Sequence, residues 1–216
     1  MSIDQHTLPL FPLNTVLFPN SSLPLQIFED RYMQMLRTCL DNDSKFGVVL
    51  IREGPEVGGQ ATHYDIGTVA EIVSVNREKD GLFRISTIGR QRFQVIQTSD
   101  EKPYINADVL LLNEESDIRE GSGLINEVRQ AASSHISLIE GLQGGWVNNF
   151  MAPLDPVSLS YFIASALQID QLSKQELLEE KLVSKRLETE LEILTRASLP
   201  IKQVVKRRLA QKFSRN

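Results

Sequence analysis

The sequence predicts an α+β fold in which a closed or nearly closed β-barrel with one early helix is followed by a bundle of α-helices. Three observations predict this fold. Prolines interrupt the most apolar stretch near the start, hydrophobic residues alternate with a period of two between residues 45 and 113, and helical spacing takes over after residue 113. We therefore expect a barrel lobe over residues 1–113 and a helical lobe over residues 114–216.

The composition is typical of a globular protein with a sizeable core. Of 216 residues, 41% are hydrophobic and 24% are charged. The formal net charge of -5 argues against a protein whose whole surface follows a nucleic-acid backbone. Cys39 is the single cysteine, so no intramolecular disulfide can form, and a reducing compartment is favoured. We expect Cys39 to be a small hydrophobic residue of the core rather than a nucleophile.

Pro9, Pro12, Pro19 and Pro24 lie in a stretch that could begin a targeting peptide, a membrane segment or a barrel. A secretory signal has a basic start and an unbroken apolar run, whereas residues 1–7 contain no Lys or Arg. A membrane helix needs about 20 mostly apolar residues, which no window of the sequence approaches. Proline is tolerated at strand edges and bulges. We therefore expect short strands at the rim of a barrel, and a cytoplasmic protein.

Seven short strands and one helix are expected in the first half of the chain. Helical spacing of apolar residues predicts a helix from residue 29 to about residue 40. Residues 79–81 carry the sequence Lys-Asp-Gly, which indicates a hairpin turn. The strand-like runs cover residues 8–11, 23–28, 45–51, 66–76, 81–89, 92–98 and 103–113.

Helix-capping signals divide the second half. Asp155 is followed by a proline, which is typical of an N-cap and the first helical position. Ser173 and Glu176 have the spacing of a capping box for the next helix. A long leucine-rich helix then leads to Pro200, which we expect to kink or end it.

The order of these elements resembles the N-terminal substrate-binding domain of Lon proteases. That family begins with Leu-Pro-Leu-Phe-Pro-Leu, then Val-Leu-Phe-Pro-Asn/Gly, then a strand ending in Ile-Phe-Glu and a helix opening with Arg-Tyr. Here these stand at residues 8–13, 16–20, 27–29 and 31–32, and later elements at residues 46–51, 66–72, 89–95 and 177–194 agree. The resemblance covers nearly the whole chain. It implies a PUA-like β pseudo-barrel followed by a C-terminal α-helical bundle with a long helix.

The resemblance implies a non-catalytic, polypeptide-binding protein rather than an enzyme. Neither an ATPase nor a Ser–Lys protease module is visible, so we expect a stand-alone recognition domain, an adaptor in protein quality control. It would hold unfolded or degron-bearing polypeptides in a cleft between its lobes, for a separate ATP-dependent protease. The glycine-rich residues 54–61 lack the Lys and Ser/Thr of a phosphate loop. The histidines are far apart. We therefore expect no nucleotide, metal or other cofactor.

Four residues are candidates for contact with a polypeptide. Trp146 and Phe150 lie in a glycine-flanked segment between helices, where an aromatic side chain can contact a client or pack against the bundle as a lid. Arg90 and Arg92 in the sequence Gly-Arg-Gln-Arg-Phe can line the barrel rim or pair with neighbouring acids.

The C-terminal segment is a second candidate surface. No acidic residue follows Glu192, and an amphipathic helix is expected to carry a candidate basic partner surface: Lys202, Lys206, Arg207, Arg208 and Lys212. Such a helix can contact nucleic acid, an acidic partner or a membrane surface, or balance its own dipole in solvent. The alternative function is therefore an RNA-binding PUA-like protein, against which the acidic net charge weighs. The oligomeric state stays open, a homodimer included.

Overall fold

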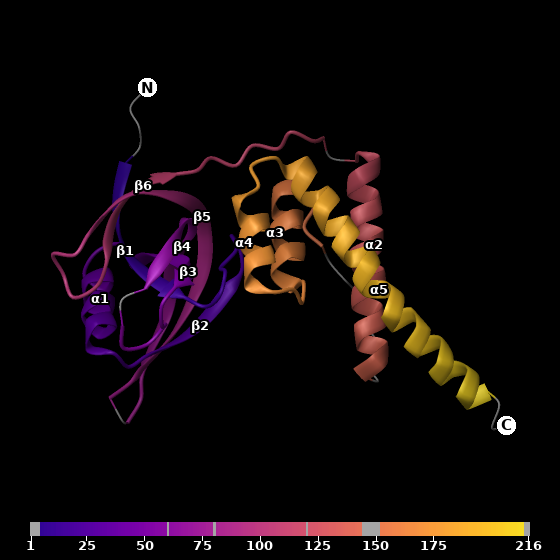
Figure 1. The fold of residues 1–216 in the computed structure, drawn as a ribbon, viewed down its shortest axis with the longest axis horizontal. Helices are drawn as coiled ribbons and strands as arrows, with labels where there is room; N and C mark the ends of the chain where they lie inside the picture. Colours follow the sequence, from indigo (N-terminus) through magenta and orange to yellow (C-terminus); the bar gives the residue numbers. More distant parts are fainter. Residues whose placement is uncertain (1–4, 60, 80, 120, 144–151, 214–216) are drawn as a thin grey trace. The chain divides into compact units, whose positions relative to one another are not determined.

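The structure is a computed structural model that describes residues 5–59, 61–79, 81–119, 121–143 and 152–213 (Figure 1). It confirms the predicted α+β class, with six strands and five helices in the described residues. The chain divides into two compact units. The first contains Met1–Glu114 and Gln168–Glu179, and the second contains Glu115–Leu167 and Glu180–Asn216. No helix among the described residues is long and apolar enough to cross a membrane.

Among the described residues, the first unit holds the six strands and two of the helices. In chain order these are β1 (Gln5–Leu13), β2 (Ser22–Ile27), α1 (Asp30–Leu40), β3 (Lys45–Glu53), β4 (Thr62–Arg77), β5 (Phe83–Ser99), β6 (Asn106–Leu111) and α4 (Gln171–Glu179). The second unit is built from α2 (Gly123–Gln143), α3 (Pro156–Ala166) and α5 (Val183–Phe213).

The six strands form one sheet in the order β2-β5-β4-β3-β1-β6, and a further pairing of β5 with β6 closes it into a barrel. The β1–β3 pair is parallel and the other pairs are antiparallel. The prediction of seven strands is wrong by one, because residues 81–89 and 92–98 belong to the single strand β5. Arg90 and Gln91 break the hydrophobic alternation there without breaking the strand. The Arg90 side chain pairs with Glu71, and the side-chain amide of Gln91 donates a hydrogen bond to the Leu112 carbonyl.

Two hydrophobic clusters fill opposite faces of the strands, as the period of two requires. On β3, for example, Val48 belongs to one cluster and its neighbour Val49 to the other. Helix α1 covers the first cluster, to which it adds Cys39, buried as expected. In the second cluster Phe93 packs over a glycine of β3. A Cβ atom on Gly47 would lie 2.6 Å from the Phe93 ring, so only glycine fits there.

Helix α4 belongs to the first unit although the chain on either side of it belongs to the second. The predicted boundary after residue 113 lies next to the end of the first unit at Glu114, but placing all later residues in a helical lobe misses this return. The reason is a set of hydrogen bonds to the barrel. Gln171 Oε1 accepts from the Val16 amide at 3.0 Å, and Gln175 Nε2 donates to the Ile66 carbonyl at 3.0 Å.

The second unit packs α5 against α2 and α3, and Figure 1 shows α2 and α5 side by side. The predicted cap at Asp155 is confirmed, since its carboxylate accepts from the Ser158 amide at 2.8 Å. The predicted capping box at Ser173 is wrong, because Asp170 caps α4 by accepting from both the amide and the hydroxyl of Ser173. Helix α5 continues through Pro200 rather than ending there.

Candidate functional site

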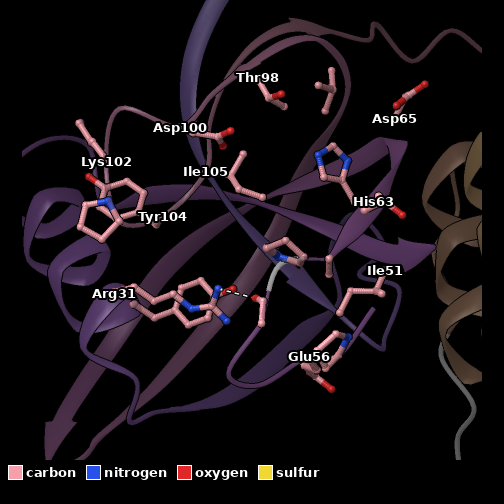
Figure 2. A pocket seen from close by; sticks show the side chains of 18 of the residues that line it. Arg31, Ile51, Glu56, His63, Asp65, Thr98, Asp100, Lys102, Tyr104 and Ile105 are labelled. Atoms are coloured by element: carbon pink, nitrogen blue, oxygen red, sulfur yellow. Dashed lines mark hydrogen bonds between the residues drawn. The ribbon is translucent and has the colours of Figure 1, made fainter. Parts of the chain in front are cut away.

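A pocket of about 750 Å³ lies in the first unit, beside the point where β4 and β5 separate (Figure 2). The two strands pair from Arg77 and Phe83 as far as Ile66 and Gln94. Beyond that point β4 continues beside β3, whereas residues 95–99 of β5 continue beside β6. The pocket is lined by residues of both diverging ends, and its volume is within the range of sites that take small molecules or short chain segments.

Irregular pairing creates the separation of the two strands. In the pairing of β4 with β3, Gly67 lies opposite Val49 and His63 lies opposite Ile51. Between these two pairs β4 contains more residues than β3, so β4 bulges. In the pairing of β5 with β6, Val95 and Gln97 lie opposite two consecutive residues of β6. Ile96 is therefore an extra residue of β5 without a partner on β6. A bulge bends its strand and turns a side chain to a new direction. Ile96 is accordingly 53% exposed, and it lines the pocket.

A glycine-rich loop, residues 54–61, closes one side of the pocket and is attached to the start of α1. The amide of Gly58 donates to Glu29 Oε2 at 3.1 Å, and Arg31 Nη1 donates to the Gly59 carbonyl at 2.9 Å. Arg31 also pairs with Glu29 at 3.0 Å. Gly58 has a φ of 76°, which favours glycine. The loop joins the antiparallel strands β3 and β4 and forms a wall of the pocket, held by these hydrogen bonds to Glu29 and Arg31.

The aromatic side chain of Tyr32 forms part of the lining near this ion pair. Its ring lies 4.1 Å from that of Phe11, centroid to centroid, and the Arg31 guanidinium lies 4.5 Å above it. Burial raises the pKa of Tyr32, while the neighbouring Arg31 acts in the opposite direction. Tyr32 therefore stays protonated and serves as an apolar surface.

The rest of the lining combines apolar side chains with acids. The apolar part includes Ile51 and Ile105 as well as Ile96. Asp65 and Asp100 are exposed, and no ion pair is formed by either among the described residues. Lys102 lies with its ammonium 5.5 Å from the Tyr104 ring centroid. Figure 2 shows side chains of both strands and of the residues after β5 around the same space.

The pocket can bind a ligand through three kinds of group: the edges of the strands, apolar side chains and acidic side chains. Across the described residues there is no group of three or more His, Cys, Asp or Glu side chains that could hold a metal ion. His63 lines the pocket, with its Nδ1 at 2.9 Å from the Tyr64 carbonyl.

The two arginines predicted to contact a polypeptide do not line this pocket. Arg90 forms two hydrogen bonds with Glu71, at 2.8 and 3.2 Å, on the surface of the barrel; the hydrogen bond with Arg90 lowers the pKa of Glu71. Arg92 is 2% exposed, and its guanidinium binds the Glu114 carboxylate and the Leu178 carbonyl. The alternative of pairing with neighbouring acids therefore holds for both side chains, and a contact with polypeptide stays a prediction.

The other predicted site residues fall outside the described part of the structure. Trp146 and Phe150 lie among residues 144–151, which are not described. The basic residues of the C-terminal segment fall within α5, but their side chains are outside the described residues: Lys202, Lys206, Arg207, Arg208 and Lys212. The two binding surfaces that they define stay predictions, and so does the RNA-binding alternative.

A model of the family described as the ATP-dependent protease La (LON) substrate-binding domain matches residues 7–196. Lon protease 1 of Bdellovibrio bacteriovorus is 26% identical over 227 residues, covering 100% of this chain and 28% of that protein. Lon protease of Anaeromyxobacter dehalogenans is 28% identical over 193 residues, covering 88% of this chain and 23% of that protein. The chain thus spans about a quarter of the length of these relatives.

Solved structures agree with the family model. The Lon N-terminal domain protein from Xanthomonas campestris is 25% identical, with a TM-score of 0.65 over 87% of this chain and 98% of that one. The N-terminal domain of the Mycobacterium avium complex Lon protease has a TM-score of 0.67 at 16% identity, over 88% of this chain and 98% of that one, a likeness of fold.

Proposed function

Because the chain belongs to the ATP-dependent protease La (LON) substrate-binding domain family, we propose that it binds unfolded or degron-bearing polypeptides through the pocket between β4 and β5. The proposed role is recognition without catalysis. As an adaptor in protein quality control, the protein would hold a client for a separate ATP-dependent protease. Trp146 and Phe150 are proposed as further contacts, on the sequence argument alone.

One observation carries the choice of this pocket. A large apolar side chain, Ile96, is turned outward by a bulge into a hollow that also contains the ends of two diverging strands. A folded protein buries most of its large apolar side chains and pairs most of its backbone N–H and C=O groups, whereas an unfolded chain exposes both. Apolar surface beside open strand ends is therefore complementary to unfolded chains and not to folded ones.

The test compares binding to one polypeptide in two states. Lysozyme that has been reduced and carbamidomethylated is unfolded, and native lysozyme has the same sequence apart from the modified cysteines. We expect saturable binding of the fluorescently labelled unfolded form, measured by anisotropy, and at least tenfold weaker binding of the native form. Ile96→Ser should weaken binding of the unfolded form about fivefold or more, since it removes most of the apolar surface of that side chain.

Val73 offers a matched control for Ile96. It is also the extra residue of a bulge, between Ile72 and Ser74 of β4, and it is 49% exposed, but it does not line the pocket. Val73→Ser should leave the affinity within twofold of the parent protein. Equal losses in the two variants would exclude the pocket as the binding site, and equal affinity for the two forms of lysozyme would contradict the function itself.

A further inference from the structure

The strand ends beside the pocket have edges whose backbone N–H and C=O groups pair with no described strand. At Phe93 and Gln94, β5 pairs with β4 on one side and with β6 on the other. From Val95 to Ser99 the β6 pairing continues, whereas none of these residues pairs with β4 in the described structure. The same holds for the facing side of β4 at residues 62–65. The barrel therefore has an open seam, with one free strand edge on each side.

We propose that this seam is closed by the bound polypeptide itself, which adds as a β-strand to residues 95–99 of β5 and carries Lys or Arg side chains toward the acids of the pocket. The inference rests on the proposed function and states how the client is held. Backbone N–H and C=O groups of a free edge can pair with any extended chain, so strand addition gives affinity without requiring a particular sequence. A protein that recognises unfolded chains needs that property.

The other free edge of the sheet is less suited to this pairing. Strand β2 pairs only with β5, so its outer side is open in the described structure. Pro24 lies in the middle of β2, however, and proline has no N–H to donate to an added strand. Residues 95–99 contain no proline, and the pocket provides side-chain contacts next to them.

The charges of the lining favour a basic segment. Asp65 and Asp100 form no ion pair among the described residues. The Glu56 carboxylate accepts a hydrogen bond from the uncharged side-chain amide of Asn14 at 2.8 Å. The positive charge of Arg31 is balanced by Glu29. Lys102 is the one other Lys or Arg side chain among the residues that line the pocket. The acids thus outnumber the uncompensated cations, and a Lys or Arg of the client would find carboxylates at the rim.

N-methylated peptides test the backbone pairing. The probe is a labelled ten-residue peptide in which lysine alternates with valine or threonine, and two derivatives carry N-methyl groups on its odd or on its even residues. In a strand, alternate residues direct their N–H groups to opposite sides. We expect one derivative to bind at least tenfold more weakly than the parent peptide, and the other within threefold. Hydrogen exchange at residues 95–99 should slow when the parent peptide is bound.

Each other outcome has a defined meaning. If both derivatives bind like the parent peptide, strand addition is wrong although the proposed function stands. If both bind tenfold more weakly, slowed exchange at residues 95–99 supports pairing with both edges of the seam, and unchanged exchange overturns strand addition. If neither the parent peptide nor unfolded lysozyme binds, the proposed function itself has failed.

The charge preference has its own test. The double substitution Asp65→Asn and Asp100→Asn should weaken binding of the lysine-containing peptide at least fivefold at low salt and reduce the salt dependence of its affinity. Glu127→Gln, at an exposed position of α2, is the matched control and should change neither quantity by more than twofold. An affinity that stays unchanged in the double variant would overturn the preference for basic segments.

Discussion

Glu190 is a carboxylic acid whose side chain is fully buried in the second unit. Its Oε1 accepts from the Ser160 hydroxyl at 2.8 Å, and its Oε2 has no hydrogen-bond partner in the described structure. Burial raises the pKa of Glu190 well above its ordinary value, although the nearby Arg186 acts in the opposite direction. The Arg186 guanidinium donates to Ser160 Oγ at 2.6 Å and lies 4.1 Å from the Tyr161 ring centroid.

The stability of the second unit should therefore depend on pH through Glu190. Its pKa is higher in the folded than in the unfolded state, so its contribution is complete below the unfolded value of about 4.3 and is lost as the pH rises toward the folded pKa. Over that interval the free energy of unfolding should fall by up to about 1.4 kcal/mol per pH unit relative to Glu190→Gln. Urea unfolding at several pH values measures the difference.

Glu188→Gln is the control for this substitution, because Glu188 is exposed on the same helix. It should leave the pH dependence of the parent protein unchanged. If Glu190→Gln shows the same pH dependence as the parent protein, Glu190 does not change its protonation between the two states over this interval.

At the scale of elements, Arg92 connects three parts of the first unit. It lies on β5, its guanidinium pairs with Glu114 just after β6, and it donates to the Leu178 carbonyl of α4. Arg92→Met removes these hydrogen bonds and leaves the carboxylate and the carbonyl without this donor. We expect a loss of about 3 kcal/mol in the free energy of unfolding, because breaking a buried pair leaves its partner uncompensated.

The neighbouring Arg90 provides the comparison for Arg92. Its pair with Glu71 is exposed, and exposed pairs contribute little. Arg90→Met should therefore change the urea midpoint much less than Arg92→Met, and faster hydrogen exchange in α4 should appear only with Arg92→Met. Equal effects of the two substitutions would mean that Arg92 does not hold α4 to the barrel.

Features that depend on neighbouring residues were easier to predict from the sequence than features that depend on the pairing of distant strands. Asp155 was predictable as a cap, because a proline in the next position leaves few other interpretations. Ser173 was assigned wrongly, since Asp170 three residues earlier competes for the same role and its carboxylate accepts two hydrogen bonds. The pocket was not predictable, because it depends on register shifts at Ile96 and near Asp65 that only the pairing of distant strands creates. The one available signal was the glycine-rich loop at residues 54–61.

At the scale of the whole molecule, the chain leaves the first unit at Glu114 and returns to it for α4. The sequence does not reveal this return, because α4 has the same helical pattern as its neighbours. Contacts between distant residues assign it to the barrel, among them those of Gln171 with Val16 and of Gln175 with Ile66. The family match covers both units, and the pocket lies within the first unit alone. The proposed polypeptide-binding site therefore lies on the barrel.

Photo-crosslinking from position 96 tests this placement most directly. A photoreactive benzoylphenylalanine is introduced in place of Ile96 or, as the control, in place of Val73, and each protein is irradiated with unfolded or native lysozyme. We expect a covalent adduct with unfolded lysozyme from position 96, at a yield several times that from position 73, and no adduct with native lysozyme. Equal yields from the two positions, or a higher yield from position 73, would contradict the proposal that the pocket between β4 and β5 binds unfolded polypeptide.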